Sequence, residues 1–180
     1  LNGLWFLLVV VMLFSWQVSQ SATFVGIISA LTMIPTVVTG PFFGVLMDRC
    51  NIIHAAYGSN IAMMSATLII ILAQSMGTIS PLFLVILAIY IGIITSAHHP
   101  MRLSLGPRLV QRHQIGSVSA LAALNFNIAR AVSPFVAGIV IAKFGINAAL
   151  CLTLMLYLPN LYITGTLQPR EITRSTEYQS

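Results

Sequence analysis

The segment Gly40–Asn51, with the sequence GPFFGVLMDRCN, decides how the rest of the chain is organised. It lies between two long apolar runs and contains Asp48, the only acidic residue before position 171. An Asp–Arg pair at the end of an apolar helix must lie where water begins, because an ionised group is costly to bury in hydrocarbon. This segment therefore marks one boundary of a membrane, and the other segments can be counted outward from it.

The composition indicates a membrane protein. Of the 180 residues, 58% are hydrophobic and only 6% are charged, and the mean hydropathy is +0.96. A soluble domain carries about 25% charged residues, so lipid must be the solvent for much of this chain. The net charge of +5 does not indicate a nucleic-acid partner, because the basic residues fall in short breaks between apolar runs.

Six apolar segments are candidates for transmembrane helices, which need about 20 residues each. They are Gly3–Trp16, Ala22–Met47, Ile52–Gln74, Pro81–Met101, Ser117–Ala142 and Ile146–Thr166. The first is short and the chain starts with Leu1 rather than Met, so we expect a fragment whose first helix is truncated. We expect residues 1–167 to form one all-α six-helix bundle and residues 168–180 to form a cytoplasmic tail or the start of a linker.

The distribution of basic residues predicts the orientation of the bundle. Connections between the segments alternate between very short ones and basic ones, so the basic connections share one face. That face holds Arg49, Arg102, Arg108, Arg112, Arg170 and Arg174, whereas the opposite face holds only Lys143. Cytoplasmic loops collect Lys and Arg, so both ends of the bundle are expected to be cytoplasmic.

Two stretches suggest an internal repeat. Pro41–Gly44 and Pro134–Gly138 end the second and fifth segments, on opposite faces of the membrane. In both, a Gly precedes a basic residue by five positions and a turn-forming residue by seven. This arrangement is what a three-plus-three inverted repeat predicts.

Small residues and prolines indicate how the segments pack and bend. Gly40 and Gly44 form a small-xxx-small pair, and the fifth segment is rich in Ala, Ser and Gly, including Gly138. Small side chains let helices approach closely in lipid, although Gly is also common in membrane helices for other reasons. Pro100 and Pro134 are expected to bend their helices, because proline removes a backbone hydrogen bond.

The loop after the second segment resembles the signature of the major facilitator superfamily. That signature reads Gly, three residues, Asp, Arg, one residue, Gly and two basic residues. Gly44, Asp48 and Arg49 match it, Asn51 stands at the second Gly, and two isoleucines replace the basic pair. Asn tolerates the left-handed backbone that favours Gly there.

Other stretches are similar to the branch that contains enterobactin exporters and macrolide efflux proteins. They are Ser19–Ala22 with Gly26 and Pro35, Pro100–Arg102 with Pro107–Val110, and Asn125–Arg130 with Pro134. The chain departs from the branch at Leu4, Gln17 and Ser133, where relatives often carry Asp, Glu and Gly.

The resemblance implies the N-terminal half of a twelve-helix transporter that exports small amphipathic molecules, of drug or siderophore type, by alternating access. A lysophospholipid flippase and a non-transporting six-helix membrane partner are the alternatives. The implied driving force is a proton gradient, which makes the protein an antiporter, and no other cofactor is expected. Expected partners are the lipid bilayer, a small-molecule substrate and a missing C-terminal half or a second copy. The expected location is the bacterial inner (plasma) membrane.

The resemblance also implies a cytoplasmic gate built from Gly44, Asp48, Arg49 and Arg102. In this interpretation the Asp48 carboxylate holds the inner gate shut through a nearby Arg and a helix N-terminus, where negative charge is favoured. The alternative is a solvated ion pair worth at most about 1 kcal/mol.

Arg130 lies near the middle of the membrane, 14 residues from Gly116 and thus about 21 Å along the helix. A charge there costs roughly 2.5–3.5 kcal/mol on insertion scales. Asn127 and Ser133 share its face at helical spacing. Arg130 either lines the substrate cavity and attracts acidic groups, or clamps carbonyl groups of a neighbouring helix.

No motif indicates an enzyme or an ATP-driven pump. The sequence contains no GxxxxGK[ST] loop and no metal-ligand cluster. His98 and His99 titrate near neutral pH in ordinary surroundings, but adjacent helical positions point about 100° apart. They are more simply interfacial residues than a metal site or a proton relay.

Overall fold

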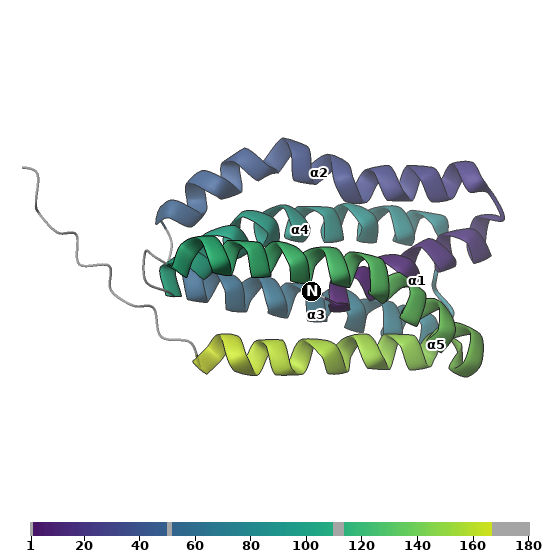
Figure 1. Ribbon diagram of the computed structural model, residues 1–180. Helices are drawn as coiled ribbons and strands as arrows, with labels where there is room; N and C mark the ends of the chain where they lie inside the picture. Colours follow the sequence, from purple (N-terminus) through teal and green to yellow (C-terminus); the bar gives the residue numbers. More distant parts are fainter. Residues whose placement is uncertain (1, 50–51, 110–113, 167–180) are drawn as a thin grey trace, which may run out of the picture.

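The computed structural model describes the backbone of residues 2–49, 52–109 and 114–166, and the side chains of residues 3–45, 53–97 and 114–166. Within these ranges the chain is helical apart from short connections (Figure 1). The helices are α1 (Asn2–Ser19), α2 (Ala22–Arg49), α3 (Ile52–Ser75), α4 (Pro81–Leu109) and α5 (Ile115–Thr166). The predicted all-α class is confirmed for the part of the chain that the structure describes.

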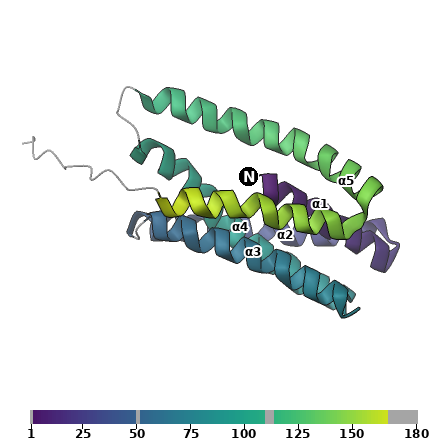
Figure 2. The same cartoon turned by 90° about the horizontal axis from the view of Figure 1, so that it is seen from below.

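Gly145 divides α5 into two arms, which we call the first arm (residues 115–144) and the second arm (residues 146–166). Its φ of 81° and ψ of 172° are non-helical, in a region that glycine enters far more readily than other residues. The chain reverses direction at this point, and the arms run in opposite directions (Figures 1 and 2). The fifth and sixth predicted helices are therefore joined, and five helices are counted instead of six in the described chain.

Several predicted helix ends are wrong. The connection predicted between Arg102 and Gly116 is shorter, because α4 continues to Leu109 and α5 begins at Ile115. At the other end of the bundle, α1 continues to Ser19 instead of Trp16. Hydropathy shows where a helix leaves lipid, whereas the backbone hydrogen bonds that define the helix continue into water.

The helix ends gather at two opposite ends of the bundle. α2 and α4 end at the left of Figure 1, where α5 also begins and ends. α1 and α3 end at the right, where α5 reverses. Arg49, the last residue of α2, thus lies at the opposite end from Lys143, which comes just before the reversal.

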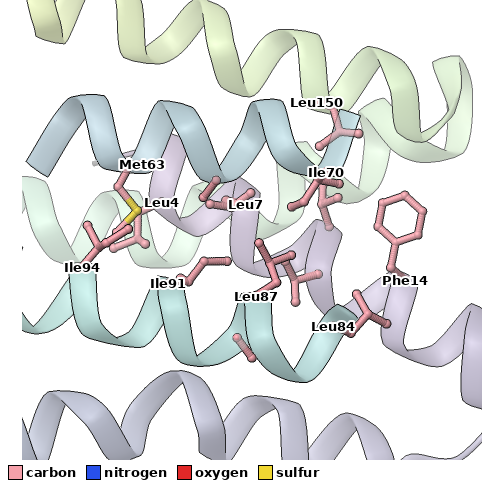
Figure 3. Close-up of a cluster of buried hydrophobic side chains, with 14 of the residues drawn as sticks. Leu4, Leu7, Phe14, Met63, Ile70, Leu84, Leu87, Ile91, Ile94 and Leu150 are labelled. Atoms are coloured by element: carbon pink, nitrogen blue, oxygen red, sulfur yellow. The ribbon is translucent and has the colours of Figure 1, made fainter. Parts of the chain in front are cut away.

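The apolar core lies between α1, α3, α4 and the second arm of α5 (Figure 3). Its largest fully buried side chains include Leu7, Met63, Ile70, Leu84, Ile91 and Leu150. α2 contributes Ile28 to this core and otherwise packs mainly along α4. The core therefore fixes α1, α3 and α4 relative to one another, and α2 and the first arm of α5 lie on its flanks.

Two helix pairs make the most extensive contacts, α2 with α4 and α1 with α5. In the first pair, a Cβ atom added at Gly92 would lie 2.9 Å from the carbonyl oxygen of Thr32, so only glycine permits this approach. Thr39 Oγ1 and Ser96 Oγ share a hydrogen bond of 2.5 Å in the same pair. In the second pair, Ala129, Ser133 and Ala137 form the buried stripe of the first arm.

A polar cluster joins α3 to the second arm of α5. Asn160 Nδ2 donates a hydrogen bond of 2.9 Å to Asn60 Oδ1. Asn60 Nδ2 donates one of 3.4 Å to Thr164 Oγ1, and the Thr164 hydroxyl donates to the Asn160 carbonyl oxygen at 2.7 Å. Buried polar groups need such partners, and this cluster holds the second arm in register with α3.

The described helices are suited to a membrane. α2, α3 and α5 contain stretches long and apolar enough to cross one, Ala22–Val45, Ile53–Ser75 and Ile115–Thr166. Shorter apolar helices cover Gly3–Ser19 and Pro81–Ala97. Large apolar side chains such as Val37 and Phe42 are exposed on the outside of the bundle, as lipid or another protein surface would require.

Candidate functional site

Arg130 lies on the first arm of α5, midway between Ile115 and Gly145 and about 22 Å from each at 1.5 Å per residue. Its side chain is exposed on the described bundle, and its guanidinium carbon lies 5.7 Å from the centre of the Trp5 ring. A guanidinium within about 6 Å of an indole is attracted by the negative face of the ring. The structure thus brings together a central cation and an aromatic group from α1.

Trp5 connects the two helices of this site. Its ring meets the Phe126 ring edge to face, with 5.8 Å between centroids and an interplanar angle of 64°. Its Nε1 atom is buried and has no hydrogen-bond partner in the described chain. α1 begins beside the middle of the first arm (Figures 1 and 2), which is why a residue so near the start of α1 reaches Arg130.

The predicted polar stripe around Arg130 is divided. Asn127 is exposed like Arg130, and its Nδ2 donates a hydrogen bond of 3.0 Å to the Ala123 carbonyl oxygen of its own helix. Ser133 is instead buried, with 3% of its surface exposed, on the stripe that it shares with Ala129. The exposed polar face is therefore formed by Asn127 and Arg130, without Ser133.

No carboxylate accompanies Arg130 among the side chains that the structure describes. The three acidic residues of the chain are Asp48, Glu171 and Glu177, and none of their side chains belongs to the part that the structure describes. Within that part, no group of three or more His, Cys, Asp or Glu side chains lies together. The chemistry that the described site offers is thus a positive charge beside aromatic rings.

Two openings flank α1. A cleft of about 450 Å³ lies between α1 and α2 and is lined by Trp5, Leu8, Val9, Met12, Leu13, Ser29, Thr32 and Met33. A groove of about 260 Å³ lies between α1 and the two arms of α5 and includes Phe6, Asn125, Ser133 and Leu152. Trp5 lines the cleft and is also the aromatic partner of Arg130.

The predicted gate lies mostly outside the described residues. α2 ends at Arg49 and Arg102 falls within α4, so the two segments reach the same end of the bundle (Figure 1). The side chains of Asp48, Arg49 and Arg102 are outside the described ranges, and so are those of His98 and His99. Gly44 is described, and a Cβ atom there would meet nothing within 4 Å. The gate contact stays a prediction.

The residues predicted to pack or bend helices have different surroundings. A Cβ atom added at Gly40 or Gly138 would meet nothing within 4 Å, so neither contacts another described helix closely. Pro134 lies inside α5, where the backbone stays helical on both sides. Pro100 falls within α4, but its side chain is outside the described residues. A packing role of Gly40 and Gly138 therefore requires a partner beyond the described chain.

Sequence reasoning did not find the Trp5–Arg130 contact or the close approach at Gly92. The two members of each pair lie far apart in the chain, so no local spacing reveals them. One signal was available for Trp5. An Arg in the middle of an apolar segment that contains no acid needs an aromatic or neutral partner, and the chain has only two Trp residues.

Comparison with known proteins identifies the family. The family model described as transmembrane secretion effector, MFS_3, matches residues 3–176. No curated protein and no solved structure gives a significant match. The matched range includes every helix described above, with the exception of Asn2 at the start of α1. The chain belongs to the transmembrane secretion effector family of the major facilitator superfamily, and is an integral, multi-pass membrane protein of a transporter family.

Proposed function

We propose that this protein is a secondary active exporter of small amphipathic molecules and that the face around Arg130 lines its transport path. The observation that carries the proposal is the position of Arg130. It is exposed at the midpoint of an apolar helical arm. Facing lipid at that depth would cost roughly 2.5–3.5 kcal/mol, so the face is better explained by a water-filled cavity.

The pairing of the helices supports an inverted repeat. In such a repeat, α1, α2 and α3 form one unit, and α4 and the two arms of α5 form the other. α1 then corresponds to α4, and α2 corresponds to the first arm. The α2–α4 pair would then become the pair of α1 and the first arm. α2–α4 and α1–α5 are the two most extensive helix pairs, although the second includes contacts of both arms of α5. Transporters built from such repeats work by rocking the repeats about a central site.

The polarity of the bundle supports cytoplasmic ends. Arg49 is the last residue of α2, Arg102 and Arg108 lie in the last turns of α4, and Arg170 and Arg174 follow α5 in the sequence. Arg112 lies between α4 and α5 in the sequence, and Lys143 lies at the opposite end of the bundle. By the positive-inside rule the end with these arginines faces the cytoplasm, as in a bacterial inner membrane. A complete cavity then needs a second six-helix unit facing Arg130, either another part of the natural protein or a second copy.

The gate and the driving force complete the proposal. In it, Asp48 closes the cytoplasmic end through Arg102 and the start of α3. A proton gradient drives the cycle, and the coupling acid belongs to the second unit because the described side chains include no carboxylate. Alternating access then carries the substrate from the cytoplasmic end past Arg130 to the other side.

The experiment uses inverted membrane vesicles that contain the natural protein and a fluorescent amphiphile. We expect energised vesicles to accumulate the amphiphile and an uncoupler to abolish the accumulation. Asp48→Asn should lower the initial rate without lowering the amount of protein in the membrane. Losing a charge-assisted contact of about 1.5–3 kcal/mol corresponds to a roughly ten- to hundredfold loss.

Lys143→Gln is the matched control, because it also removes one charge at a helix end and should leave the rate unchanged. Normal accumulation by Asp48→Asn would show that the gate is assigned wrongly. Vesicles that accumulate no amphiphile under any gradient would contradict the proposed function itself.

A further inference from the structure

We propose that Trp5, Arg130 and the α1–α2 cleft form one binding site for an anionic amphiphile, with the acidic head at Arg130 and the apolar body in the cleft. The inference rests on the proposed export function and names the class of substrate. It separates acidic amphiphiles from the cationic dyes and drugs that an exporter of small molecules could equally carry.

The geometry places the two parts of the site next to each other. Trp5 lines the cleft between α1 and α2, and the guanidinium of Arg130 lies 5.7 Å from the centre of the same ring. The same indole therefore contacts both the charge and the cleft. We expect a single small molecule to place its head at Arg130 while its body lies in the cleft.

The cleft suits an apolar body. Its volume of about 450 Å³ lies within the range of typical small-molecule sites, about 300–1,000 Å³. Apart from Ser29 and Thr32, its lining side chains are aliphatic, aromatic or thioether groups. Met12 and Met33 are flexible and polarisable, so they adapt to bodies of different shape.

The charges of the described chain select an anion. Arg130 carries five N–H donors and no acceptor, and no Asp or Glu side chain belongs to the described part of the chain. Among the described side chains, a cationic head at this position would meet the guanidinium without a compensating carboxylate. A carboxylate or sulfonate would instead accept charge-assisted hydrogen bonds, which are among the strongest in proteins.

The neighbouring rings show where the head would bind. Phe126 packs edge to face against Trp5, and Arg130 lies 5.7 Å from the centre of the same ring. Phe126 and Arg130 belong to the first arm, whereas Trp5 belongs to α1. A head group at Arg130 would therefore lie where α1 meets the first arm.

The test compares three probes that share a pyrene ring and a butyl tether and differ only in the head group. They are 1-pyrenebutyrate, 1-pyrenebutanol and 1-pyrenebutylamine. Binding to the purified natural protein in lipid nanodiscs is followed by energy transfer from tryptophan to pyrene. We expect the acid to bind about tenfold more tightly than the alcohol, and the amine to bind less tightly than either.

Two substitutions at Arg130 and a control at Lys143 test whether Arg130 causes the preference for the acidic probe. Arg130→Gln should bind acid and alcohol equally, Arg130→Lys should keep part of the preference, and Lys143→Gln should keep all of it. Met33→Phe narrows the cleft without adding a tryptophan donor and should weaken the binding of all three probes without changing their order. Circular dichroism and the elution volume show whether each variant is folded, and Met33→Phe tests the site even if Arg130→Gln does not fold.

Equal binding of acid and alcohol, a preference for the amine, or an unchanged preference in folded Arg130→Gln would overturn the inference. Export of all three probes at equal rates by vesicles would overturn the anion site while keeping the export function. A preference for the acid in binding, without export of any probe, would keep the site and overturn the export function.

Discussion

Gly92 and Arg130 are two residues whose roles depend on contacts with distant parts of the chain. The depth of Arg130 could be predicted, because helical rise converts sequence position into distance. Its partner Trp5 could not, since cation–π contacts between helices leave no periodic signal. Gly92 likewise resembles any other glycine in a membrane helix, although α2 lies directly against it.

Replacing Gly92 by Ala should destabilise the fold. The new Cβ atom would lie 2.9 Å from the Pro35 Cγ atom and from the Thr32 carbonyl oxygen, and 3.0 Å from the Leu31 carbonyl oxygen. Two of these neighbours are backbone atoms, so α2 and α4 must move apart, at a cost of about 1–3 kcal/mol. The loss of helical circular dichroism with increasing SDS in mixed micelles measures the free energy of unfolding.

Gly58→Ala is the matched control for Gly92→Ala. Gly58 lies within α3, and a Cβ atom there would meet nothing within 4 Å. Alanine favours helix over glycine by about 0.5–1 kcal/mol, so this variant should be as stable as the wild type or more stable. Equal stability of the two variants would show that α2 and α4 are not packed closely at Gly92.

At the scale of the elements, helix starts were easier to predict than helix ends. α2, α3 and α4 begin at the predicted residues, because a polar or Gly-rich break precedes each apolar run. α4 ends at Leu109 instead of Met101, since polar residues can extend a helix beyond the lipid. The reversal of α5 falls inside the predicted break of residues 143–145, where Gly145 alone has non-helical angles.

Gly145→Ala should weaken the reversal of α5. The positive φ of 81° at this position is strained for any residue with a Cβ atom, even though no neighbouring atom lies within 4 Å of that position. Such strain costs about 1–3 kcal/mol, and SDS unfolding should report a loss of that size.

Gly138→Ala serves as the control for Gly145→Ala, because Gly138 is in the same helix with no positive φ and no close neighbour. It should leave the free energy of unfolding unchanged or raise it slightly. If both variants unfolded alike, the reversal would not depend on the backbone angles of Gly145.

At the scale of the whole molecule, the bundle has two contrasting sides. α3 and the first arm of α5 lie on opposite sides of the bundle in Figure 2. The exposed face of α3 is apolar, with Ile61 and Leu68 among its side chains, and suits lipid. The first arm exposes Asn127 and Arg130 among apolar residues, and suits water or a second polar surface.

This contrast could be predicted only in part from the sequence. Composition and charge placement predicted a membrane bundle with a polar position on the fifth segment. Which side of that segment is buried depends on how α1 packs against it, and hydropathy is nearly uniform around each helix. The sequence therefore predicts that Ser133 shares the face of Arg130, whereas in the structure Ser133 is buried with Ala129 and Ala137.

The measurement that tests the account most directly is the reactivity of single cysteines in intact membranes. In a background where Cys50 and Cys151 are replaced by Ser, Asn127→Cys places a thiol beside Arg130, and Ile61→Cys places one on the exposed face of α3. Each variant is treated with a membrane-impermeant methanethiosulfonate reagent. A water-filled path predicts rapid modification at position 127 and almost none at position 61, because only a hydrated thiol ionises and reacts. If position 127 proved as unreactive as position 61, the Arg130 face would not line a transport path.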